Sequence, residues 1–187
     1  MMKNIRSVLA VLVALGCCFP LIGSADQTDQ RLEELFQTLR TSQDGTVLGE
    51  TESTIWEIWY ESGEDDIDAL MLEAAQLVRV GDLADAESIY SRIIDTMPNF
   101  AEGWNRRATV RFYQNDYAGS LADIEQTLKL EPRHFGAIWG LGMILGSQRD
   151  YQRAINAFEL LLEIKPNAGD ARPRIELLKQ ELARESV

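Results

Sequence analysis

The chain has 187 residues, a formal net charge of −12 at pH 7, two cysteines and one histidine. Nucleic acids and anionic membrane surfaces are recognised largely through clustered lysine and arginine, so this acidic composition disfavours both as partners. Both cysteines, Cys17 and Cys18, lie within the first 25 residues. The rest of the chain therefore has no thiol for a disulfide, a catalytic nucleophile or a cysteine-ligated metal.

Residues 1–25 have the pattern of a secretory signal peptide. Two basic residues precede an apolar stretch from Val8 to Phe19, and small residues follow up to Ala25. We expect cleavage near Ala25 and a periplasmic or secreted mature protein. Because the leader holds two basic and no acidic residues, the mature chain would carry a formal charge of −14. No later segment approaches the roughly 20 apolar residues that a membrane span requires.

An alternative interpretation of the leader involves Cys17. Ala14, Leu15 and Gly16 resemble the motif that precedes the lipid-modified cysteine of bacterial lipoproteins, although Ala14 stands where that motif prefers leucine. In this case the protein would be tethered to a membrane through Cys17.

Residues 26–66 predict a pair of amphipathic helices. In the first, apolar residues from Leu32 to Leu39 recur at the spacing of one helical face, and the second carries Ile55, Trp56, Ile58, Trp59 and Tyr60 before Gly63. Such aromatic density demands burial, so we expect this pair to cap the open end of the segment that follows. An exposed aromatic docking surface is the alternative. In the acidic stretch that comes next, Asp65 or Asp66 is expected to cap a helix, since a calcium loop would need ordered ligands around a glycine.

A 34-residue period follows. Pro98, Pro132 and Pro166 close three segments of equal length, 67–100, 101–134 and 135–168. Small residues recur at the eighth position (Ala74, Ala108, Gly142) and the twentieth (Ala86, Ser120, Ala154), whereas large ones recur at the twenty-fourth (Tyr90, Ile124, Phe158). Small residues at two facing positions allow two helices to cross closely. The period therefore predicts three stacked helical hairpins.

These positions resemble the tetratricopeptide repeat (TPR), most closely in residues 135–168. The second segment departs from the family pattern with Arg107 at position 7 and Arg111 at position 11. The resemblance implies an all-α, right-handed α-solenoid. A carboxyl-terminal helix within 169–187, with Pro173 in its first turn, is expected to cover the last repeat.

The resemblance also implies that the first helix of each repeat lines a concave groove for a protein or peptide. The groove residues expected from it are Met71, Arg79, Asn105, Thr109, Phe112, Tyr113, Trp139 and Met143. One known use of such a groove is to clamp a terminal carboxylate with lysine and asparagine side chains. This chain has Met71, Ala75, Gly136 and Gly140 at the clamp positions, and Arg106 where asparagine is usual, so a carboxylate clamp is not expected.

Catalytic motifs are sparse in this sequence. His134, the one histidine, falls in a turn between repeats and is expected to be a surface residue, and no serine lies in a nucleophile-elbow sequence. Metal-ligand spacing and phosphate-binding glycine loops are also absent, so we expect no enzyme activity, cofactor or metal. Two hypotheses of function remain: an interaction module of the cell envelope that binds a partner in its groove, or a structural subunit that self-associates through apolar surfaces.

Overall fold

The structure, a computed structural model, describes residues 26–185, and within this range the regular secondary structure is entirely helical. Its helices are α1 (Arg31–Thr41), α2 (Gly45–Tyr60), α3 (Asp65–Val80), α4 (Leu83–Thr96), α5 (Ala101–Tyr113), α6 (Tyr117–Leu130), α7 (Phe135–Ser147), α8 (Tyr151–Ile164) and α9 (Ala171–Glu185). The expected leader and its Cys17 lie outside the described residues.

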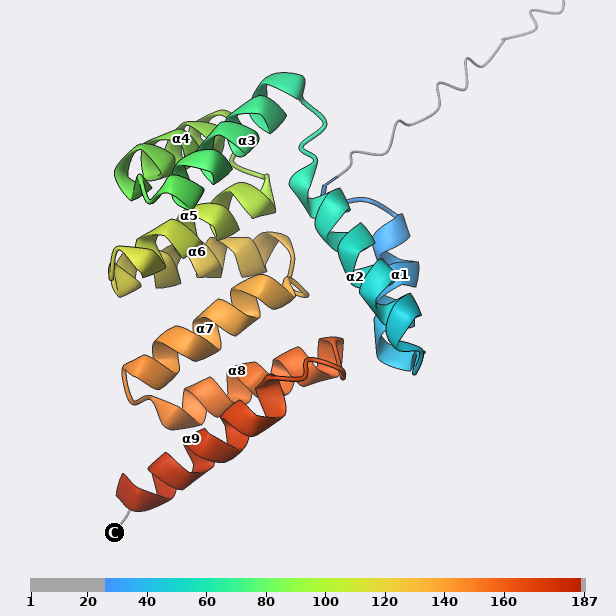
Figure 1. The fold of residues 1–187 in the computed structure, drawn as a ribbon, viewed down its shortest axis with the longest axis vertical. Coiled ribbons are helices and arrows are strands. Elements are labelled where there is room, and N and C mark those ends of the chain that lie inside the picture. The colour runs from blue at the N-terminus through green and yellow to red at the C-terminus, as the bar shows by residue number, and fades with distance from the viewer. Residues whose placement is uncertain (1–25, 186–187) are drawn as a thin grey trace, which may run out of the picture.

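Helices α3 to α8 form three antiparallel hairpins stacked along one direction, and α9 packs against α8 at the end of the stack (Figure 1). Each hairpin corresponds to one of the three 34-residue segments, although α3 begins at Asp65, two residues before the first segment. The predicted all-α solenoid is confirmed. No helix in residues 26–185 combines the length and apolar character that crossing a membrane requires.

The turn inside each hairpin repeats with the 34-residue period. Gly81, Asn115 and Arg149 occupy equivalent positions, and each has a positive φ, between 63° and 84°. The next residue is an aspartate in every case, and its carboxylate accepts a hydrogen bond from a backbone N–H in the first turn of α4, α6 or α8 (Asp82, Asp116, Asp150). One left-handed residue followed by one N-cap therefore sets each reversal of the chain.

The close helix crossing expected at the small residues is seen between α7 and α8. A Cβ atom added to Gly142 would lie 2.7 to 2.9 Å from ring carbons of Phe158, below any normal contact distance. Ala154 is also fully buried in this interface. The glycine is therefore required by packing, because the Phe158 ring fills the space of a side chain at position 142.

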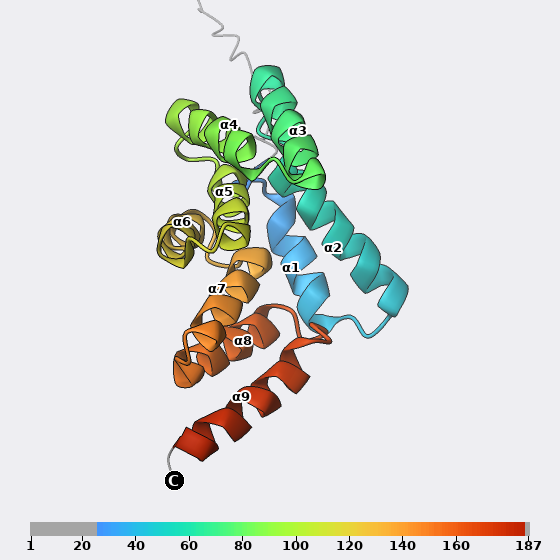
Figure 2. The ribbon, with the colours of Figure 1, turned by 60° about the vertical axis from the view of Figure 1, so that its left-hand side comes forward.

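The amino-terminal pair does not cap the open end of the first repeat, and that expectation is wrong. Helices α1 and α2 run alongside the stack, as Figures 1 and 2 both show, and they contact α5 and α8. Leu32, Phe36 and Trp59 join one hydrophobic core with Phe135 and Phe158 of the third repeat. The aromatic residues of α2 thus find their burial on the side of the array instead of at its end.

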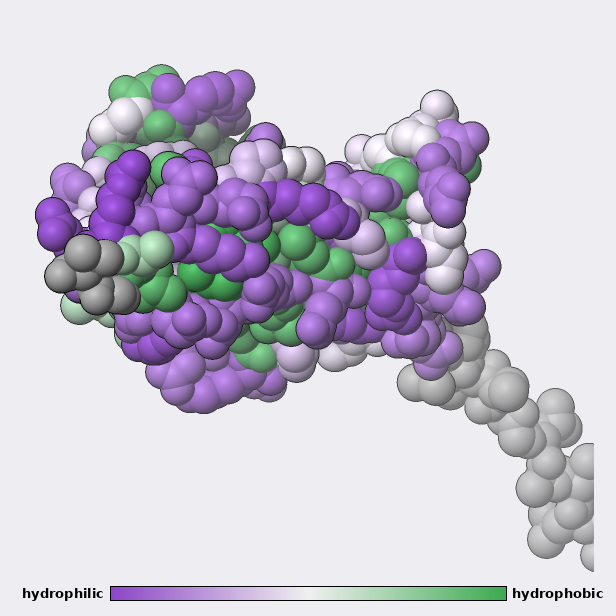
Figure 3. Space-filling view, turned by 90° about the horizontal axis from the view of Figure 1, so that it is seen from below, coloured by the Kyte–Doolittle hydropathy of each residue, from purple (hydrophilic) through white to green (hydrophobic). Residues whose placement is uncertain are grey.

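The first repeat consequently keeps an uncovered face. Leu72 and Val80 of α3 are 62% and 78% exposed. The equivalent position of the third repeat is occupied by Gly140, where an added Cβ atom would lie 3.4 Å from Ile124 of the preceding α6. On the view of the opposite end in Figure 3, hydrophobic residues show as patches between hydrophilic ones.

The start of α3 differs from expectation in one detail. Its N-cap is Glu64, whose side chain makes no cap hydrogen bond, so neither Asp65 nor Asp66 is the cap. Both lie in the first turn, where their charge still faces the positive end of the helix dipole. Asp68 instead accepts hydrogen bonds from the backbone N–H and the hydroxyl of Ser62 and so closes the connection from α2.

Candidate functional site

A cavity of about 200 Å³ opens between α5 and α7, with one side closed by α6. Its walls are mainly apolar and aromatic, and no charged side chain lines it. The lining residues are Asn105, Ala108, Thr109, Phe112, Tyr113, Ser120, Ile124, Gly136, Ala137, Trp139, Gly140, Met143 and Ile144. We call this cavity the α5–α7 groove.

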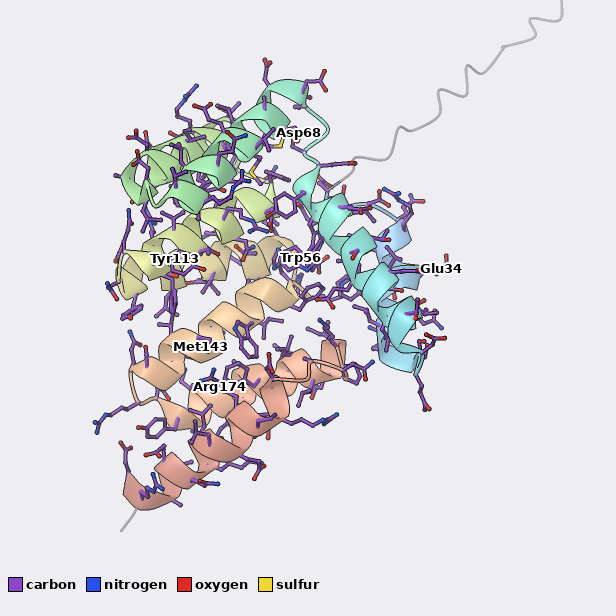
Figure 4. All side chains as sticks on the ribbon, in the orientation of Figure 1. Glu34, Trp56, Asp68, Tyr113, Met143 and Arg174 are labelled. Atoms are coloured by element: carbon purple, nitrogen blue, oxygen red, sulfur yellow. The ribbon has the colours of Figure 1, made fainter. Side chains whose placement is uncertain are left out.

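Six of the eight residues expected in the groove line this one cavity: Asn105, Thr109, Phe112, Tyr113, Trp139 and Met143. Tyr113 is the most open of them, with 57% of its surface exposed, and it stands with Phe112 near the end of α5. Figure 4 shows Tyr113 on α5 and Met143 on α7, the first helices of the second and third repeats. Trp139 packs its ring edge-on against Phe158, so it belongs both to the groove and to the core.

Met71 and Arg79 do not line this groove. Met71 is buried in the core that α3 and α4 share with Phe100. Tyr60, at the end of α2, packs against the same core, so α2 contributes to the cluster in which Met71 is buried. Arg79 lies exposed in the last turn of α3.

A buried carboxylate lies beneath the groove at the start of α5. Glu102 accepts hydrogen bonds from Asn105 Nδ2 at 2.9 Å, from Arg106 Nε and from His134 Nε2 at 2.9 Å. Burial by itself would raise the pKa of Glu102, but the Arg106 charge and the His134 hydrogen bond outweigh it and hold that pKa below its usual value. The carboxylate is therefore ionised and acts only as an acceptor.

His134 is fully buried, so the expectation of a surface residue is wrong. Its Nδ1 accepts the backbone N–H of Ala137 and so caps α7, which leaves the ring proton on Nε2 to face Glu102. The imidazole also stacks on Trp59 of α2. The turn position concealed this burial because the aromatic residues that cover His134 come from a helix more than 70 residues earlier in the chain.

The same carboxylate positions the contact with α2. The guanidinium of Arg106 lies 4.3 Å from the ring centroid of Tyr60 and 5.6 Å from that of Trp56. Trp56 points from α2 toward the array in Figure 4, and its ring is so close to Gly136 that a Cβ there would lie 2.7 Å away. Glycine at position 136 thus admits Trp56 to the edge of the groove.

A second cavity, of about 310 Å³, continues from that edge between α2, α7 and the end of α8. It shares Gly136 and Trp139 with the α5–α7 groove and adds Trp56, Phe135 and Lys165. Lys165 pairs with Glu52 of α2 at 2.5 Å. The resemblance to a repeat gave no sign of this cavity, since α2 lies outside the repeats.

The two arginines that depart from the family pattern form a buried ion network. The side chain of Asp123, on α6, is only 2% exposed. Its carboxylate accepts hydrogen bonds from Arg107 Nε at 2.9 Å and Nη2 at 2.8 Å, and from Arg111 Nη1 at 3.0 Å. Arg111 also pairs with Glu87, and Arg107 donates to Ser91, both on α4. Charged residues therefore replace apolar packing between three helices, with their partners supplied by the neighbouring helices.

In the described residues no group of three or more histidine, cysteine, aspartate or glutamate side chains is arranged to hold a metal ion. Glu102 and His134 are buried, and in the part of the chain that the structure describes their side chains hydrogen-bond to each other, to Asn105 and Arg106, and to the backbone of Ala137. The chemistry that the groove offers is apolar contact and hydrogen bonding.

Comparison with known proteins gives consistent results. The family model described as tetratricopeptide repeat matches residues 105–169. A TPR repeat-containing protein of Rhizobium etli is 34% identical over 154 residues, which cover 82% of this chain and 76% of the relative. Tetratricopeptide repeat protein 36 of Bos taurus is 39% identical over 62 residues, a third of each chain.

Solved structures share the fold at low identity. The first TPR domain of Spaghetti (RPAP3), bound to the HSP90 peptide SRMEEVD, superposes with a TM-score of 0.60 at 20% identity, over 63% of this chain and 93% of that one. The Sgt2 TPR domain from Aspergillus fumigatus gives 0.61 at 18% identity, over 66% and 83%. With the period, the stacked hairpins and the extent of the Rhizobium match, these findings establish that the chain belongs to the tetratricopeptide repeat family.

Proposed function

We propose that this protein is a non-catalytic interaction module of the cell envelope that holds a segment of a partner protein in the α5–α7 groove. The observation that carries the proposal is the convergence of Phe112, Tyr113, Trp139 and Met143 on one open cavity next to the polar side chains of Asn105 and Thr109. Aromatic anchors around a concave, partly polar site are typical of residues that contribute most to binding.

The structural neighbours support a peptide as the kind of ligand. The Spaghetti domain was solved with a peptide, and the TPR2B domain of yeast Sti1 with a pHsp70 partner. The present chain has Met71, Gly136 and Gly140 at positions where a carboxylate clamp carries lysine, asparagine or arginine. Met71 is also buried, and the two glycines have no side chain, so none of the three can bind a carboxylate through a side chain. We therefore infer a different ligand from the same class.

Site-specific photo-crosslinking in cells tests the groove. A photoreactive residue at Tyr113, which is exposed on the groove rim, is expected to capture one defined partner. The same residue at Leu160 serves as the matched control, because Leu160 is 41% exposed on α8 and does not line the groove. Equal capture at both positions would contradict the proposal.

The envelope location rests on the leader-like composition of residues 1–25. The mass of the protein recovered from cells tests it: a chain beginning near Asp26 in the periplasmic or secreted fraction supports export. An acylated chain beginning at Cys17 would instead indicate a membrane-tethered lipoprotein, and an uncleaved chain in the cytoplasm would contradict both.

A structural, self-associating subunit is the second candidate, and the uncovered Leu72 and Val80 of α3 favour it. Light scattering separates the two functions. A monomer supports the groove module, whereas an obligate oligomer that dissociates in a Leu72→Glu, Val80→Glu variant supports the structural subunit.

A further inference from the structure

Three polar side chains on the wall of the α5–α7 groove, Asn105, Thr109 and Ser120, each direct a hydrogen-bond donor into the protein. Asn105 Nδ2 donates to Glu102, the Thr109 hydroxyl donates to the backbone carbonyl of Asn105, and the Ser120 hydroxyl donates to that of Ala108. Glu102 fixes the orientation of the Asn105 amide, because an ionised carboxylate can only accept and so must face the amide nitrogen.

The acceptors of the groove are left for a ligand. Among the described residues no donor reaches the amide oxygen of Asn105, and the Thr109 oxygen keeps lone pairs after donating its proton. Arg106, the residue after Asn105, is turned toward Glu102 and Tyr60, and among the described residues no charged side chain lines the groove. A carboxylate or phosphate would therefore find no positive partner there.

The net charge of the chain and the volume of the groove also favour a basic segment with one large side chain. Residues 26–187 carry a formal charge of −14, since both basic residues of the first 25 are excluded and no acidic one is. An overall negative potential attracts basic segments and repels acidic ones. The cavity of about 200 Å³ is smaller than the roughly 300–1,000 Å³ of sites for drug-sized ligands, so it suits a single large side chain.

We propose that the α5–α7 groove selects a basic protein segment. An aromatic or branched aliphatic side chain of that segment fills the space between Phe112 and Trp139, and an adjacent lysine, arginine or backbone N–H donates to Asn105 and Thr109. This inference rests on the proposed groove function and names the chemistry of its partner, which is opposite in charge to a terminal carboxylate.

Selection from a random peptide-display library tests the proposal. The purified protein is the bait, and peptides that also bind the Trp139→Ala variant are removed. Because Trp139 contacts the core, Tyr113→Ala serves as a second counter-selection bait, and circular dichroism checks both folds. Enriched peptides should combine a large apolar residue with neighbouring lysine or arginine.

Fluorescence anisotropy then quantifies the preference with one enriched peptide and its copy in which each lysine and arginine is replaced by glutamate. We expect at least tenfold weaker binding of the acidic copy and weaker binding of the basic peptide at high salt. Thr109→Val, which removes one acceptor at nearly constant shape, should weaken the basic peptide about fivefold, as expected for one hydrogen bond. Thr38→Val removes a similar hydroxyl on α1 and should leave affinity unchanged.

The possible outcomes distinguish failure of the basic-segment inference from failure of the groove function. Enrichment of acidic, uncharged or carboxylate-dependent peptides that require Trp139 or Tyr113 would overturn the basic-segment inference and leave the groove function standing. A selection that yields no peptide dependent on either residue would contradict the groove function itself, and the inference with it.

Discussion

The imidazole of His134 stacks on the indole of Trp59 with ring centroids 4.1 Å apart and planes inclined by 12°. One side chain thereby caps α7, hydrogen-bonds Glu102 of α5 and supports α2. The docking of the amino-terminal pair and the alignment of the second and third repeats consequently depend on the same residue.

Replacing His134 tests how these roles divide. His134→Asn retains a side chain suited to an N-cap, whereas His134→Ala removes the cap as well, so alanine should lower the free energy of unfolding by about 1 kcal/mol more than asparagine. Both variants lose the stack on Trp59. Urea denaturation followed by circular dichroism and tryptophan fluorescence measures both effects, and equal stability of the two variants would show that the cap contributes nothing.

The ionised Glu102 should make stability depend on acid. Its pKa is lower in the folded chain than in the unfolded chain, so the unfolded state binds a proton more readily as the pH falls. The stabilisation is therefore complete above the ordinary glutamate pKa of about 4.3 and is lost as the pH falls through the lower folded value. Urea titrations at several pH values should show a smaller acid dependence in Glu102→Gln than in the unmodified protein.

Asp123 should be more important for folding than its place in a single ion pair suggests. Asp123→Asn removes the charge that two arginines share and leaves Arg107, which is 13% exposed, without a carboxylate partner. We expect a loss of about 3 kcal/mol in unfolding free energy. Glu125→Gln on the same helix breaks an exposed pair with Lys129 and is the control. A similar small loss in both variants would refute the role given to the network.

Arg149 has a left-handed backbone conformation, and replacing it by glycine should stabilise the protein. A non-glycine residue at φ 63° is strained by roughly 1 kcal/mol, which glycine relieves, so Arg149→Gly should stabilise the chain by about 0.5 kcal/mol after the entropic cost of glycine. Arg153→Gly, in the first turn of α8, should destabilise it instead. Differential scanning calorimetry gives both signs, and a lower melting temperature for Arg149→Gly would contradict the strain argument.

Two glycines of α7 provide a matched test of helix crossing. Gly142→Ala places a methyl group against the Phe158 ring and should destabilise the chain by about 1 to 3 kcal/mol despite the better helix propensity of alanine. At Gly140 the nearest atom to a new Cβ is 3.4 Å away, so Gly140→Ala should be neutral or stabilising. Thermal unfolding of the two variants measures both changes in stability. Equal melting temperatures for Gly142→Ala and Gly140→Ala would argue against close packing at position 142.

The 34-residue period was sufficient to predict the repeats, because local signals fix each hairpin. A left-handed residue, an N-capping aspartate and a proline recur in step, and small residues mark where the helices cross. Six groove residues could be placed for the same reason: within one repeat, position along the helix determines which face a side chain occupies.

The positions of α1, α2 and His134 could not be predicted in this way, since they depend on contacts between segments far apart in the chain. The composition of α2 demanded burial, but several surfaces of the array could have supplied it. Only the tertiary structure placed α2 beside α5, with Trp56 against Phe135 of α7, buried His134 against Trp59 and oriented the Asn105 amide through Glu102. Local periodicity determined the helices and their order, whereas long-range packing decided which polar atoms remain free to meet a partner.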